Sequence, residues 1–132
     1  MKEITIDEFV QGKMPKRIAL SKDIRRKVYK KTDGHCAYCG CELEYKDMQV
    51  DHVESLYWYN GTNDLDNLMP ACRPCNLYKS TQSVESMKEN LALIPQRLIR
   101  DSSTFRLALK YGLITINEKP IEFYFEGMEE KG

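Results

Sequence analysis

The stretch that decides the fold runs from residue 36 to residue 79 and reads CAYCGCELEYKDMQVDHVESLYWYNGTNDLDNLMPACRPCNLYK. It holds two Cys-x-x-Cys pairs, Cys36 with Cys39 and Cys72 with Cys75, and 32 residues separate them. Thiolates at this spacing share one metal ion, and two such pairs complete a tetrahedron of sulfur ligands. The pattern predicts a closed, structural Zn²⁺ site that holds together the two ends of the long segment between the cysteine pairs.

Four cysteines have two other common uses, as two disulfides or as the ligands of an iron–sulfur cluster. The chain has five cysteines, an odd number, and shows no secretory signal, so disulfides are not expected. Spacing alone does not separate an iron–sulfur cluster from zinc. The fifth cysteine, Cys41, is expected to pack as a small apolar side chain.

Between the cysteine pairs, the sequence predicts two short strands followed by a helix. Residues 48–53 mix apolar with polar side chains, and residues 67–71 form the returning strand. The helix begins after Cys72, where Pro74 stands near its first position. Successive side chains of a strand face opposite ways, so Asp51 and His52 serve one site only if the chain bends there.

Taken in order, three short motifs resemble those of the HNH nuclease family in its zinc-stabilised form: Asp51-His52, Asn67-Leu68 and Cys72-x-x-Cys75-Asn76-x-x-Lys79. The resemblance covers roughly residues 25–82. It implies an α+β fold whose zinc-stabilised ββα-metal (His-Me finger) core carries flanking helices. One departure is Asn76, which stands where many members have His and makes this an HNN variant. Another is Glu54-Ser55, where many members have Pro.

The resemblance also implies roles for individual residues. Asp51 and Asn76 would bind a catalytic divalent metal ion, His52 would be the general base, and Asn67 would brace the loop that bears His52. Asp and Asn offer hard oxygen ligands, which suit Mg²⁺ or Mn²⁺, and a histidine is well suited to accept a proton from water at neutral pH. Lys79 is expected to contact a phosphate as a point charge.

The function predicted from these residues is metal-dependent hydrolysis of phosphodiester bonds in double-stranded DNA. Family members of this size occur in bacteria and their phages, in restriction, mobile elements or phage DNA processing. The alternative is a non-catalytic zinc module that binds nucleic acid. Such a module would need the cysteines and basic residues but not Asp51, His52 and Asn76.

Charge is distributed unevenly along this chain of zero net charge and pI about 6.7. Residues 13–31 hold nine basic residues and one acidic residue, a net charge of +8. A basic helix can follow a phosphate backbone even on a neutral protein. The expected DNA contacts are Arg25, Arg26, Lys27, Lys30 and Lys31. No apolar run approaches the length of a membrane span, and a cytoplasmic location is expected.

The 132 residues are expected to form an N-terminal arm (1–20), the nuclease core (21–82) and an extension packed on the core (83–132). Ser21 is expected to cap a helix over 22–32. The extension is predicted to hold one helix ending near Pro95, a second interrupted around 101–103, and a C-terminal β-hairpin in which 114–116 pairs with 121–125. Tyr57-Trp58-Tyr59 is expected to cover a small core.

Overall fold

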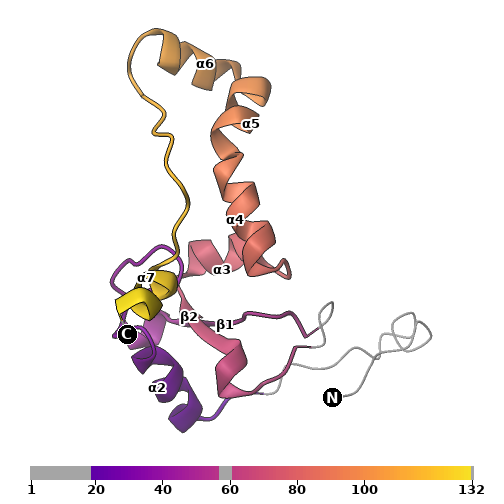
Figure 1. Ribbon diagram of the computed structural model, residues 1–132, viewed down its shortest axis with the longest axis vertical. Coiled ribbons are helices and arrows are strands. Elements are labelled where there is room, and N and C mark those ends of the chain that lie inside the picture. The colour runs from indigo at the N-terminus through magenta and orange to yellow at the C-terminus, as the bar shows by residue number, and fades with distance from the viewer. Residues whose placement is uncertain (1–18, 57–60, 132) are drawn as a thin grey trace, which may run out of the picture.

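The computed structural model describes residues 19–56 and 61–131 (Figure 1). Most of the expected N-terminal arm, and the Tyr57–Tyr59 segment, lie outside these residues. Within the described ranges, no helix combines the length and the apolar character needed to cross a bilayer.

A two-stranded antiparallel sheet lies at the centre of the core. Strand β1 (Gln49–His52) pairs with β2 (Leu68–Ala71), so that Asp51 is opposite Met69 and His52 is opposite Leu68. Helix α3 (Arg73–Lys79) follows β2 after a single residue, with a proline in its first turn. The predicted order of strand, returning strand and helix is confirmed, and it is the ββα arrangement.

Helix α2 (Lys22–Lys30) covers one side of the sheet. The Ser21 hydroxyl accepts a hydrogen bond from the backbone N–H of Ile24 at 3.2 Å, which is the predicted N-cap. The helix ends at Lys30, earlier than expected, because Asp33 and Gly34 turn the chain with positive φ angles of 51° and 78°. Its Val28 is fully buried in a cluster with Leu43, Met48 and Leu68.

A second apolar cluster joins the first cysteine pair to the C-terminal extension. Ala37 and Tyr38 are buried there with Met87 and Phe123. The backbone N–H groups of Tyr124 and Phe125 donate to the carbonyl oxygens of Tyr38 and Ala37 at 3.1 and 2.9 Å. The C-terminal segment therefore packs against the first cysteine turn.

The predicted C-terminal β-hairpin is wrong, because this segment packs against the core instead. Residues 114–123 contain no strand, and residues 124–131 form helix α7 (Tyr124–Lys131). The alternating Ile and Phe residues of this segment look like a hairpin in the sequence. However, the rings of Phe123 and Phe125 lie 5.1 and 6.1 Å from the Tyr38 ring, so they bury themselves on the core instead of pairing across a turn.

Helices α4 (Val84–Ala92), α5 (Ile94–Asp101) and α6 (Ser103–Lys110) form an arm that projects from the core (Figure 1). Pro95 stands in the first turn of α5, and the Ser102 hydroxyl caps α6, so the predicted interruption is present. The extension contacts the core through the start of α4 and through α7, while α5 and α6 lie away from it (Figure 1).

Candidate metal centre and catalytic site

The four predicted metal ligands converge. The sulfur atoms of Cys36, Cys39, Cys72 and Cys75 all lie within 4.8 Å of one another, and the Cys39 and Cys72 sulfurs are 3.8 Å apart. Four sulfurs about 2.3 Å from a central ion would be about 3.8 Å from each other. None of the five cysteines is in a disulfide. The donor set and its spacing therefore fit one tetrahedral metal ion.

The four thiols have different surroundings, and burial raises the pKa of Cys36 and of Cys75. Burial alone would raise the pKa of Cys39, but hydrogen bonds from Cys41 and from the neighbouring thiols lower it to about 7. A thiol with this pKa is about half thiolate at pH 7, and the thiolate is the form that binds metal. Cys41 is exposed, so the expectation that it packs as an apolar residue is wrong.

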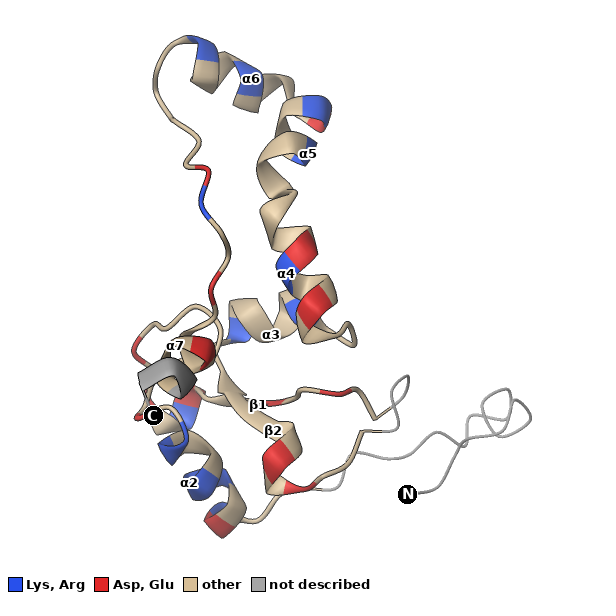
Figure 2. Ribbon diagram, viewed as in Figure 1, with Lys and Arg blue, Asp and Glu red and all other residues tan. Residues whose placement is uncertain are grey.

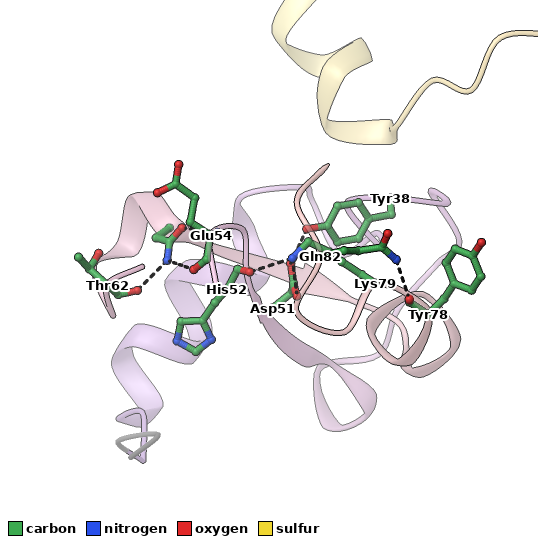
Figure 3. Close-up of polar contacts among 9 residues, drawn as sticks. Tyr38, Asp51, His52, Glu54, Thr62, Tyr78, Lys79 and Gln82 are labelled. Carbon is green, nitrogen blue, oxygen red and sulfur yellow. Dashed lines mark hydrogen bonds and ion pairs between the residues drawn. The ribbon is translucent and has the colours of Figure 1, made fainter. Parts of the chain in front are cut away.

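Asp51 lies in a buried polar cluster with Tyr38 and Lys79 (Figure 3). The Tyr38 hydroxyl donates to Asp51 Oδ2 at 2.5 Å, and the Lys79 ammonium lies 3.1 Å from Oδ2 and 3.3 Å from Oδ1. Lys79 also donates to the backbone carbonyl of His52 at 2.9 Å. One cation thus connects helix α3 to two adjacent residues of β1.

Burial raises the pKa of Asp51, and the hydrogen bonds from Tyr38 and Lys79 oppose that rise. Burial, together with the charge of Asp51, also raises the pKa of Tyr38, which keeps the hydroxyl protonated as a donor. The Lys79 side chain has no exposed surface. The expectation that Lys79 contacts a phosphate is therefore wrong, because its ammonium group pairs with Asp51 inside the protein.

His52 lies on the other face of the strand. The pairing of β1 is regular through His52, so the chain does not bend between Asp51 and His52, and the two side chains point apart (Figure 3). The imidazole is 7% exposed, and its Nε2 lies 2.8 Å from Oδ1 of Asn63. Its Nδ1 is buried and has no hydrogen-bond partner among the described residues.

Asn67 connects the strand end that bears His52 to the loop that bears Asn63. Its side chain accepts from the backbone N–H of Glu54 at 2.8 Å and donates to the carbonyls of Glu54 at 3.0 Å and Thr62 at 2.8 Å (Figure 3). Its carbonyl accepts from Val53 N–H at 2.9 Å. These are backbone hydrogen bonds of the kind expected for a brace behind His52.

Asn76 lies in α3, three residues before Lys79, and is half-buried. No hydrogen bond of its side-chain amide falls within the described part of the chain. The Asp51 oxygens, by contrast, already accept hydrogen bonds from Tyr38 and Lys79. The Asp51 side chain is 3% exposed, and the expected role of Asp51 and Asn76 as metal ligands stays a prediction.

Basic residues lie along α2 (Figure 2), and Lys31 is its C-cap. They differ in their surroundings. Arg25 donates to the Met48 carbonyl at 3.3 Å and lies over the Tyr45 ring, and Lys31 donates to the carbonyls of Leu65 and Leu68 at 2.9 and 2.6 Å. Desolvation lowers the pKa of Lys31. These two cations contact the core, and their expected role as DNA contacts stays a prediction. Arg26, Lys27 and Lys30 are exposed, as is Lys22.

Two residues of the site escaped sequence reasoning. Tyr38 lies between two cysteine ligands, and Asn63 lies in a loop where its residue type suits a turn. Neither position shows a periodic or motif signal. Their roles depend on partners that are 13 and 11 residues away in sequence.

Comparison with known proteins gives a matching family model and two similar proteins. The HNH endonuclease family model matches residues 36–82. The CRISPR-associated endonuclease Cas9 of Corynebacterium diphtheriae is 29% identical over 84 residues, which are 64% of this chain and 7% of that protein. The crystal structure of the Type II-C Cas9 enzyme from Actinomyces naeslundii matches with a TM-score of 0.48 and 24% identity, over 63% of this chain and 10% of that one.

The chain thus spans a tenth or less of the length of these two relatives. The matched residues 36–82 contain both cysteine pairs, strands β1 and β2, and helix α3. Together with the ββα arrangement and the converging cysteines, the match shows that residues 36–82 are an HNH endonuclease domain.

Proposed function

We propose that this protein is a metal-dependent endonuclease that hydrolyses phosphodiester bonds of double-stranded DNA. The observation that carries the proposal is the family match at residues 36–82, within which a buried histidine follows a buried aspartate and has a ring nitrogen with no partner among the described residues. Zn²⁺ would be held by Cys36, Cys39, Cys72 and Cys75 and would stabilise the fold. Mg²⁺ or Mn²⁺ would be the catalytic ion, held by Asp51 and Asn76. For His52 to act at the same phosphate the end of β1 would have to bend, because the side chains of Asp51 and His52 point apart along the regular strand.

His52 acts as the general base. It accepts a proton from the water whose oxygen attacks phosphorus, while the bond from phosphorus to the leaving oxygen breaks and that oxygen takes a proton from solvent. The divalent ion, when bound, stabilises the negative charge of the phosphoryl group and of the leaving oxygen. Lys79 and Tyr38 hold the Asp51 carboxylate in place, and Asn67 holds the loop behind His52.

The exposed face of α2 supplies DNA affinity. Lys22, Arg26 and Lys30 are spaced four residues apart, so they share one side of the helix. Three cations on one face can contact successive phosphates without reading bases.

The test is incubation of the zinc-loaded protein with supercoiled plasmid in Mg²⁺, in Mn²⁺ or in EDTA. We expect nicked or linear product with either ion and none in EDTA. His52→Ala should lower turnover by about 10²–10⁴-fold while DNA binding persists. If the protein binds plasmid but cuts it in neither ion, or if His52→Ala cuts like the parent, the catalytic proposal fails and the non-catalytic zinc module replaces it.

A further inference from the structure

The two nitrogens of His52 have different surroundings. Nε2 lies 2.8 Å from Asn63 Oδ1, whereas Nδ1 is shielded from solvent. Among the buried side-chain nitrogen and oxygen atoms of the described residues, Nδ1 of His52 is the only one without a hydrogen-bond partner. Most buried polar groups in proteins are paired, so this exception requires an explanation.

The contact with Asn63 indicates which nitrogen carries the proton. A neutral imidazole has one N–H donor and one lone pair, and an amide oxygen can only accept. The proton therefore lies on Nε2 and the lone pair on Nδ1. If the Asn63 side chain were flipped so that its NH₂ group faced Nε2, the proton of His52 would lie on Nδ1. That buried N–H would have no acceptor, which costs about 1–3 kcal/mol. With the Asn63 oxygen facing Nε2, only the lone pair of Nδ1 is unused, and a general base needs a free lone pair.

Asn63 is held in position by the hydrogen bonds that surround it. The Asn67 side chain donates to the carbonyl of Thr62, the residue before Asn63, and also binds Glu54, two residues after His52. The Gly61 N–H donates to Ser55 O at 3.0 Å, which adds a second connection between the same two segments. His52 and Asn63 thus face each other because two sets of backbone hydrogen bonds align their segments.

We propose that Asn63 is a positioning residue for the general base. Its amide oxygen accepts the Nε2–H of His52, fixes the tautomer with the lone pair on Nδ1, and restrains rotation of the ring. The same oxygen lies against the ring, where it would stabilise a positive charge on the imidazole. Asn63 itself touches neither substrate nor metal. The inference rests on the proposed function, in which His52 is the base.

The tautomer can be measured directly. The chain has two histidines, so ¹⁵N-histidine labelling yields two imidazole spin systems, and a His35→Gln variant assigns them. At about pH 8.5 a free imidazole is neutral, and the ¹⁵N shifts then report which nitrogen is protonated. In the zinc-loaded parent we expect His52 to be the Nε2–H tautomer. A parent spectrum with the proton on Nδ1 overturns the proposal, and this measurement requires no variant of the site.

Variants test the consequence for cleavage. Asn63→Ala should give a mixture of His52 tautomers and lower kcat on plasmid by about 10–100-fold, the usual effect of removing the partner that orients a functional histidine, with KM little changed. Asn63→Asp retains an acceptor oxygen and should restore the Nε2–H tautomer. Thr62→Ser is the matched control in the same loop, and both its kcat and its spectrum should equal those of the parent.

The outcomes separate the two proposals. If His52→Ala is inactive while Asn63→Ala keeps the parent tautomer and the parent kcat, Asn63 is not a positioning residue and the proposed function stands. If His52→Ala cuts like the parent, the base assignment itself is wrong, whatever the Asn63 variants do. Should Asn63→Ala lose its folded circular-dichroism spectrum, the parent spectrum and the Asn63→Asp tautomer decide the matter.

Discussion

The Lys79 ammonium and the Asp51 carboxylate form an ion pair at 3.1 Å, and their side chains are 0% and 3% exposed. The pair connects α3 to β1, the helix and the first strand of the ββα arrangement. Two buried charges stabilise each other only when both are present, because either one alone would be left uncompensated in a medium of low dielectric.

We therefore predict that Lys79→Met destabilises the protein by about 3–5 kcal/mol, because it leaves the Asp51 charge buried and unpaired. Urea denaturation of the metal-loaded protein measures the change. The double variant Lys79→Met/Asp51→Asn should recover part of it. Lys46→Met is the control, because Lys46 pairs with Glu44 at 3.5 Å with both side chains about three-quarters exposed. It should change stability by no more than about 0.5 kcal/mol. Equal destabilisation in the two lysine variants would refute the argument.

Removal of the metal from the four-cysteine site should unfold the domain. A structural zinc contributes about 10–16 kcal/mol in small domains, comparable with their whole stability. Cys72→Ser, or a strong chelator, should abolish the folded circular-dichroism spectrum, and elemental analysis of the parent should find about one zinc per chain. Cys41→Ser should keep both the zinc and the fold. A Cys72→Ser protein that remains folded without metal would contradict the structural role.

The exposed face of α2 should control DNA affinity. Changing Lys22, Arg26 and Lys30 to Ala should weaken binding and reduce the slope of log K against log salt by about 0.9 for each phosphate that the variant no longer neutralises. The matched control changes three exposed cations of the extension, Arg97, Lys110 and Lys119, and should leave the slope near that of the parent. Fluorescence anisotropy at several salt concentrations measures both. A larger effect in the control variant would place the DNA on the arm instead.

Gly61 is expected to be irreplaceable for steric reasons. A Cβ atom built at this position would lie 1.8 Å from the Glu54 carbonyl oxygen, which is an acceptor for Asn67. Gly61→Ala should therefore separate the segments that bear His52 and Asn63, lowering both thermal stability and cleavage. Gly127→Ala is the control, since the nearest atom there is the flexible end of the Glu122 side chain at 3.2 Å. Parent-like melting and cleavage of Gly61→Ala would show that the contact relaxes freely.

Local signals account for the parts of the core that the sequence predicted correctly. Ser21, Pro74 and Ser102 each mark a helix start through one hydrogen bond or one missing donor, and these effects act over three or four residues. The cysteine pairs could be assigned to one site because a Cys-x-x-Cys turn already places two sulfurs together. The residues expected to bind DNA were less predictable, since an exposed and a half-buried cation on the same helix look alike in sequence.

The C-terminal hairpin shows why alternation alone is insufficient. Ile114, Ile116, Ile121, Phe123 and Phe125 alternate with polar residues as a hairpin would. Alternation indicates that these side chains will be buried on one side of an extended segment, but not against which surface. Tyr38 and the first cysteine turn provided that surface for Ile121, Phe123 and Phe125, whereas Ile114 is exposed. Residues 124–131 form helix α7.

The sequence by itself determined which four cysteines converge and the order of two strands and a helix, because each depends on contacts between residues close in sequence or on a spaced motif. Only the tertiary structure decided that Lys79 is buried against Asp51, that Arg25 and Lys31 contact the core, and that Asn63 faces His52. Each of these contacts joins residues 11 to 37 positions apart. Their geometry is set by how the sheet, α2 and α3 pack together, so no local rule of sequence could have specified them.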